Sequence, residues 1–215
     1  CAINTDGQVV CWGDDYDGQS SPPEGTFTAV GAGGAHSCAI HTDGNAVCWG
    51  RDTEGQSSPP AGHFIAIAVG GAHTCGIKTD GEVVCWGWDT DGQCSPPEGT
   101  FTAITASLAH TCAIDTEGQA VCWGSDDQGE SSPPVGSLID ISAGWHHTCA
   151  VDTDGQAVCW GWDKDGQSKP PGAGTYTAIS SGWVHTCALN TQGEAVCWGD
   201  DSDGQSSPPE GTFTD

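Results

Sequence analysis

Residues Cys38–Gly50 read Cys-Ala-Ile-His-Thr-Asp-Gly-Asn-Ala-Val-Cys-Trp-Gly, and this stretch occurs six times along the chain with few changes. The copies begin near residues 1, 38, 75, 112, 149 and 187, so the step is 37 residues and the last step is 38. A fixed period of this length is typical of a repeat architecture, in which each unit packs on its neighbours. We therefore expect residues 1–215 to form a single repeat domain with an incomplete last repeat.

Each copy predicts a β-hairpin with a disulfide across it. A three-residue turn centred on Asp43 places Cys38 directly opposite Cys48, and opposed Cβ atoms are close enough to bridge. The expected pairs are Cys1–Cys11, Cys38–Cys48, Cys75–Cys85, Cys112–Cys122, Cys149–Cys159 and Cys187–Cys197. The alternatives are free thiols in a cytosolic protein or a zinc site, although the short Cys-x₂₋₄-Cys pairs usual for zinc do not occur in the sequence.

Strand alternation makes both faces of the hairpin apolar. Cys38 and Ile40 share one face, whereas Val47 and Trp49 take the other. A blade of a β-propeller has this property because it lies between two neighbours. We expect an all-β propeller of about six blades with three antiparallel strands each, and a short fourth strand around residues 26–28 is an alternative. The tryptophan of one blade should pack near the disulfide of the next.

The residues Gly71–Ile77, Asp80–Gly87 and Gly92-Gln93 resemble the RCC1-type β-propeller repeat. The resemblance covers essentially the whole chain, and Glu130 is the one departure from the Gly-Gln pairs. The short period is most similar to secreted bacterial members with three-stranded blades, such as the β-lactamase inhibitor of this type. The resemblance implies the fold but no single function, because the family includes exchange factors, photoreceptors and protein inhibitors.

The acidic charge suits cations, basic partners or a high-salt environment, and the cysteine content favours an extracellular setting. Four Lys and Arg oppose 29 Asp and Glu, which gives a net charge of −25. Such a surface repels nucleic acid and anionic membranes. Thirteen cysteines, twelve of them in paired positions, indicate an oxidising compartment. The sequence has no hydrophobic run long enough for membrane insertion, and it has no Asn-x-Ser/Thr site for glycosylation.

The last repeat stops at Thr212–Asp215, where each other repeat continues for eight residues to the next cysteine. A ring of six repeats then lacks one strand. We consider three explanations: the chain is a piece of a longer array, the ring closes imperfectly, or another chain supplies the strand by edge pairing.

Paired carboxylates before a glycine are candidate calcium ligands, because calcium takes hard oxygen ligands on a tight turn. The alternative is that these aspartates cap the loop by accepting bonds from backbone amides. The candidate residues are Asp15, Asp17, Asp52, Glu54, Asp89, Asp91, Asp163, Asp165, Asp201 and Asp203. No other cofactor is expected.

Histidines recur at the repeat period and should form a ring. A metal ring or a pH sensor is one interpretation, and hydrogen bonding to the backbone between blades is the one we favour. The residues are His36, His73, His110, His147 and His185.

Two further features vary between repeats. Trp88, Trp145, Trp162 and Trp183 are additional to the Trp-Gly pairs and are candidates for an interface, with local gap filling as the alternative. Cys94 stands where the other repeats have serine, so it is unpaired and is either free or links two chains.

The sequence favours a non-enzymatic extracellular scaffold that binds protein partners or copies of itself, as a homo-oligomer or filament. The alternative is a binding module that captures a foreign protein, as the inhibitor relatives do. An enzyme is the least favoured class, because no repeat stands out with a nucleophile and a base. Near-identical repeats also argue against a one-sided ligand site.

Overall fold

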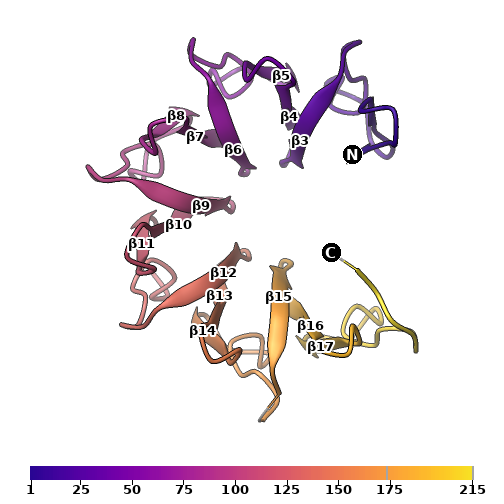
Figure 1. Cartoon of the computed structure of the whole chain (residues 1–215), viewed down its shortest axis with the longest axis vertical. Coiled ribbons are helices and arrows are strands. Elements are labelled where there is room, and N and C mark those ends of the chain that lie inside the picture. Colours follow the sequence, from indigo (N-terminus) through magenta and orange to yellow (C-terminus); the bar gives the residue numbers. More distant parts are fainter. Residues whose placement is uncertain (173, 215) are drawn as a thin grey trace.

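The computed structural model describes residues 1–172 and 174–214, and all regular elements in these residues are β-strands. They form six blades arranged in a ring (Figure 1). Blade 1 is a hairpin of β1 (Ala2–Ile3) and β2 (Val9–Val10), and the other five blades are three-stranded antiparallel sheets. Their strands are β3 (Phe27–Ala32), β4 (His36–His41) and β5 (Ala46–Gly50) in blade 2; β6 (Phe64–Val69), β7 (His73–Lys78) and β8 (Val83–Gly87) in blade 3; β9 (Phe101–Ala106), β10 (His110–Asp115) and β11 (Ala120–Gly124) in blade 4; β12 (Leu138–Ala143), β13 (His147–Asp152) and β14 (Ala157–Gly161) in blade 5; and β15 (Tyr176–Ser181), β16 (His185–Asn190) and β17 (Ala195–Gly199) in blade 6.

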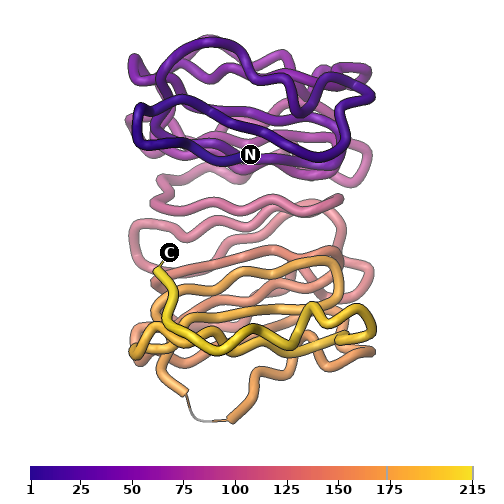
Figure 2. Tube along the Cα trace, turned by 90° about the vertical axis from the view of Figure 1, so that its right-hand side faces the viewer, coloured from indigo at the N-terminus to yellow at the C-terminus, as the bar shows by residue number. Residues whose placement is uncertain are grey.

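The first strand of each three-stranded blade is nearest the middle of the ring, and the turn after it points to the centre (Figure 1). The side view shows strands running along the ring axis, with the blades stacked around it (Figure 2). Both termini lie on one side, at either edge of the place where the ring is open. The expected propeller is therefore confirmed. Phe27 begins the inner strand β3, so the segment around residues 26–28 is not a separate fourth strand.

The hairpin register agrees with the cysteine spacing. Cys38 and Cys48 are direct partners in the β4–β5 pairing, and a disulfide joins them with a Cα–Cα distance of 4.0 Å. The turn places Gly44 at φ +88°, a conformation that side chains with a Cβ rarely adopt. All six expected disulfides are present, one in each blade.

The cores lie between blades. Trp86 of blade 3 packs with Cys38, Ile40 and Phe64, and its indole Nε1 donates a hydrogen bond to the Gln56 carbonyl at 2.9 Å. The same arrangement recurs around the ring. The tryptophan therefore covers the disulfide of the preceding blade, and our expectation that it would cover the next one was wrong. Strand alternation fixes which side chains share a face, but it does not say which neighbour that face meets.

Candidate functional site

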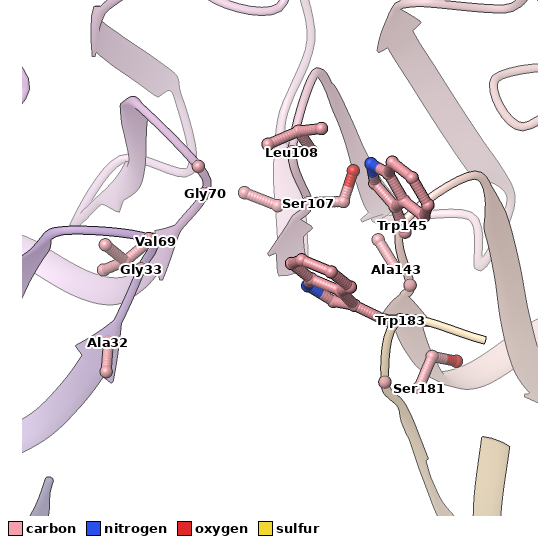
Figure 3. Close-up of a pocket in the computed structure, with 15 residues that line it drawn as sticks. Ala32, Gly33, Val69, Gly70, Ser107, Leu108, Ala143, Trp145, Ser181 and Trp183 are labelled. Carbon is pink, nitrogen blue, oxygen red and sulfur yellow. The ribbon is translucent and has the colours of Figure 1, made fainter. Parts of the chain in front are cut away.

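The turns between the first and second strands of blades 2 to 6 surround the mouth of the central channel. They enclose a cavity of about 270 Å³ at the centre of the ring (Figure 3). The second position of each turn is Gly34, Gly71, Leu108, Trp145 or Trp183, in the order of the blades. One side of the mouth is therefore lined by small groups, and the other side carries two indole rings.

Glycines on the small side allow neighbouring turns to touch through their backbones. Gly71 N donates to the Ser107 carbonyl at 2.9 Å, and a Cβ at Gly33 would collide with the Gly70 carbonyl. The close approach leaves no room for side chains between these turns. The turns of blades 5 and 6 approach equally closely at Gly144 and Gly182, so the two sides of the mouth differ in the second turn position, where the larger side chains of blades 4 to 6 stand.

Three of the four tryptophans expected at an interface lie together, and two of them, Trp145 and Trp183, line the mouth. Trp145 and Trp183 are stacked, with ring centroids 5.3 Å apart and planes at 27°. Trp162, which follows β14, meets Trp145 edge to face at 6.2 Å. Trp183 is 73% exposed, whereas Trp145 and Trp162 are half-buried. Figure 3 shows both turn tryptophans on one side of the cavity, with Gly33 and Gly70 on the other. We call Trp145, Trp162 and Trp183 the tryptophan cluster.

Trp88 is the fourth candidate and lies outside this cluster. It lines a separate depression of about 220 Å³ beside blade 3, together with Arg51, Glu54 and Ala72. Its backbone N donates to the Ala72 carbonyl, as Trp162 N donates to the His146 carbonyl. The two tryptophans thus occupy equivalent places in their blades, and only Trp162 has further aromatic side chains beside it.

A buried carboxylate lies beneath the cluster, and the sequence analysis did not identify it as a site. Glu130 is fully buried and replaces the glutamine of the other repeats. His146 replaces an alanine or valine, and its Nδ1 lies 3.3 Å from Glu130 Oε1. The His146 ring centroid is 4.7 Å from that of Trp145. The signal in the sequence was that both residues depart from the repeat and are 16 positions apart.

Several hydrogen bonds keep Glu130 ionised. Burial alone would raise the pKa of this carboxyl, but donors from its own backbone, from Gln128 and from the side chains of Ser125 and His146 outweigh it and lower the pKa. Ser125 Oγ donates to Oε1 at 2.9 Å, and Gln128 N donates to Oε2 at 2.7 Å. The Ser125 hydroxyl is therefore directed at Glu130 rather than at His146, which is not the arrangement of a nucleophile and its base.

Acidic loops surround the mouth at the same end of the propeller. In blades 2 to 6 the loop begins with a backbone N that donates to a carbonyl of the turn, as Arg51 N does to Ala35 O at 2.9 Å. The first carboxylate of each predicted calcium pair caps its own loop in most blades: Asp52 accepts bonds from Ser57 N at 2.8 Å and Ser58 Oγ at 2.6 Å. No group of three or more metal-binding side chains occurs in residues 1–172 and 174–214. Calcium binding remains a prediction, and capping accounts for these carboxylates without a metal.

The periodic histidines join neighbouring blades as expected, but they bond a threonine side chain and not the backbone group that we favoured. His36 Nε2 lies 2.8 Å from Thr74 Oγ1, and His73, His110 and His147 bond the threonine of the following blade in the same way. The Thr74 hydroxyl donates its one proton to the Gln56 carbonyl. It must therefore accept from the histidine, so the proton of the neutral ring is on Nε2. Burial lowers the pKa of these four histidines to about 4, so they are uncharged at neutral pH.

Cys94 takes over the role of a serine. Its Sγ lies 3.2 Å from the Trp88 carbonyl, where Ser57 Oγ donates to the Arg51 carbonyl in the preceding blade. It is the free cysteine of the described residues and is half-buried. Burial, with a contribution from Asp89, raises the pKa of the thiol to about 12. The thiol is thus held in its unreactive form.

The chain belongs to the family of the regulator of chromosome condensation (RCC1) repeat. The family model matches residues 27–56, 64–93, 101–130, 138–167 and 176–205, so each match runs from an inner strand to the loop glutamine or Glu130. No curated protein matches the sequence.

Solved structures of the same fold include two receptor kinase ectodomains and yeast RCC1. The ectodomain of the Physcomitrella patens receptor kinase CR4 is 24% identical with a TM-score of 0.81, over 93% of this chain and 59% of that one. The ectodomain of the Arabidopsis thaliana receptor kinase ACR4 is 26% identical with a TM-score of 0.68, over 81% and 64%. Yeast RCC1 (Prp20), solved with Kap60 bound, is 18% identical with a TM-score of 0.71, over 82% and 56%. The chain thus spans less than two thirds of each of these relatives.

Proposed function

We propose that this chain is an extracellular, non-enzymatic propeller that binds a protein partner at the mouth of its channel. The observation that carries the proposal is the tryptophan cluster, in which Trp183 is largely exposed although the repeats are otherwise nearly identical. Exposed aromatic side chains beside a shaped cavity are typical of the energetic centre of a protein interface.

The extracellular location is supported by two observations. Each blade carries a disulfide, and such dense pairing persists in oxidising compartments. The fold is also that of two plant receptor ectodomains. In the part of the chain that the structure describes, no helix is long and apolar enough to cross a membrane.

The proposal is tested by quantitative capture of partners from the extracellular fluid of the source. Wild-type protein and the Trp183→Ala variant are immobilised in the oxidised state, and Trp88→Ala is the matched control in another blade. A partner retained in a fixed molar ratio by wild type and Trp88→Ala, and lost with Trp183→Ala, is the expected result. Equal retention by all three proteins would contradict the assignment of the binding surface.

A second candidate is self-association, which one specific contrast favours. In blades 3 to 6 the tryptophan of the Trp-Gly pair is at most 8% exposed and caps the preceding blade, but Trp12 of blade 1 is 69% exposed. Blade 6 has an open apolar face with a cavity of about 190 Å³ beside Ile179, Cys187 and Leu189. These two surfaces have the chemistry of the contact that recurs between blades, so a further blade matches them, and in this candidate that blade belongs to a second copy of the chain.

Light scattering after size exclusion tests self-association of the oxidised chain over a range of concentrations. Head-to-tail contact predicts a mass that rises with concentration, and a Trp12→Ser, Leu189→Asp variant should remain monomeric. A wild-type mass of 21.9 kDa at all concentrations would contradict self-association, and the proposed partner-binding surface would still stand.

A further inference from the structure

The tryptophan cluster and the charge around it point to a definite ligand chemistry. We infer that the mouth of the channel recognises a basic side chain of the partner, an arginine or a lysine that enters end-on against the indole rings. The inference rests on the proposed function and adds the class of residue that is bound.

The indole rings of the tryptophan cluster supply the first attraction for a cation. An indole face carries negative electrostatic potential and attracts a guanidinium or ammonium group more strongly than the other aromatic side chains do. Trp183 presents an exposed ring at the cavity, and Trp145 stacks beside it at 5.3 Å. Trp162 is set edge to face against Trp145 at 83°, which holds that ring in place. A long basic side chain can lay its methylene groups along the small-residue side of the mouth while its charge meets the rings.

Glu130 supplies the second attraction for a cation. Its carboxylate is fully buried below His146, and its hydrogen bonds keep the negative charge in place. A charge enclosed by protein is screened less by salt and water than one at the surface, so its field reaches the mouth. Among the repeats the charge occurs only in blade 4, whose loop lies under the turn of blade 5 that carries Trp145. The Glu130 charge and the indole groups of the tryptophan cluster therefore lie at the same place in the propeller.

The loops around the tryptophan cluster supply the third attraction for a cation. The loops of blades 4, 5 and 6 lie at the same end as the mouth and carry mainly carboxylates. Lys164 and Lys169 are the basic side chains there, and Lys169 is paired with Asp163. These loops extend an acidic field that accelerates the approach of a cation and repels an anion. The acidic residues in question are Asp126, Asp127, Asp163, Asp165, Asp200, Asp201 and Asp203.

The test uses peptides that differ in charge but not in shape. An acetylated, amidated Gly-Arg-Gly-Arg-Gly peptide is titrated into the whole oxidised chain, and the same peptide with citrulline in place of arginine is the neutral match. Binding is followed by tryptophan fluorescence and by calorimetry at low and at high salt. We expect the arginine peptide to bind at least tenfold more tightly than the citrulline peptide, with a preference that shrinks as salt rises.

Variants separate a defined site from a general acidic surface. Trp183→Ala should lower the affinity for the arginine peptide about tenfold. Glu130→Gln, which restores the residue of the other repeats, should lower this affinity several-fold. Trp88→Ala should lower it less than twofold. Equal binding by Trp183→Ala would show that the charged loops act without the rings and would overturn the inference. Equal affinity for the citrulline peptide would also overturn it, yet would leave the proposed function standing. Partner capture that does not depend on Trp183 would contradict both the inference and the proposed function.

Discussion

Replacing one buried histidine should make the protein measurably less sensitive to acid. His73 is fully buried, and burial is the largest cause that lowers its pKa from 6.5 to about 4, with a smaller effect from His36 and an opposing one from Asp89. Between these two pH values the unfolded chain takes up a proton at this position and the folded chain does not. The contribution of His73 to stability is therefore fully present above pH 6.5 and is lost as the pH falls towards 4.

The size of the effect follows from the two pKa values. Between pH 7.5 and pH 4.5, the linkage relation gives a loss of about 2–3 kcal/mol for this one group. The variant His73→Gln keeps an amide that can donate to Thr111 and has no group that titrates in this range. It will be less stable than wild type at pH 7.5, but its free energy of unfolding should fall by about 2–3 kcal/mol less than that of wild type on going to pH 4.5.

Guanidinium unfolding of the oxidised protein, followed by tryptophan fluorescence, measures both free energies. His63→Gln is the control, because that ring is exposed and bonds the Asp43 carbonyl at the surface. Proton NMR of the His73 ring provides an independent reading and should show no titration above pH 5. Parallel pH profiles of wild type and His73→Gln, or a ring resonance that titrates near pH 6.5, would refute the reasoning.

Four more outcomes can be checked by unfolding or thiol chemistry. Trp86→Phe removes the hydrogen bond to the Gln56 carbonyl and should lower the free energy of unfolding by about 1–3 kcal/mol. An unchanged unfolding midpoint would mean that the carbonyl finds another donor. Replacing Cys38 and Cys48 together by serine should lower the free energy of unfolding by about 2–3 kcal/mol, because the unfolded chain becomes more flexible. A change in the spectrum of the folded protein would point to a different cause. Cys94→Ser should alter the unfolding free energy by less than about 0.5 kcal/mol. In the wild type, Cys94 should react with disulfide reagents at pH 8 far more slowly than a free thiol does, because burial raises its pKa to about 12.

The sequence predicted what short-range geometry determines. Nine residues between Cys38 and Cys48 allow one symmetric hairpin, and the alternation of side chains follows from it. The direction in which Trp86 packs could not be obtained this way, because it depends on how the twisted sheets are arranged around the ring. The period shows that a neighbour exists on each side, but it does not show which neighbour receives which face.

The candidate site was predicted residue by residue but not as an assembly. Trp145 and Trp183 were noticed because they vary between repeats, yet they are 38 positions apart and meet only because neighbouring turns converge at the channel. Glu130 was visible as a departure from the repeat, but its pairing with His146 requires the loop of one blade to lie under the turn of the next. A search for positions that break the repeat together would have found this pair.

The distribution of variation among the blades decides between a uniform scaffold and a one-sided surface. The residues that join blades, namely the ring histidine, its threonine partner and the disulfide, are almost the same throughout the ring, so blade packing gives no blade a distinct role. The second position of the central turn behaves differently, since it is glycine in blades 2 and 3 and tryptophan in blades 5 and 6. Near-identity of the repeats therefore does not argue against a ligand site. The repeated residues build a rigid frame, and the few that differ are gathered where side chains from several blades reach one cavity.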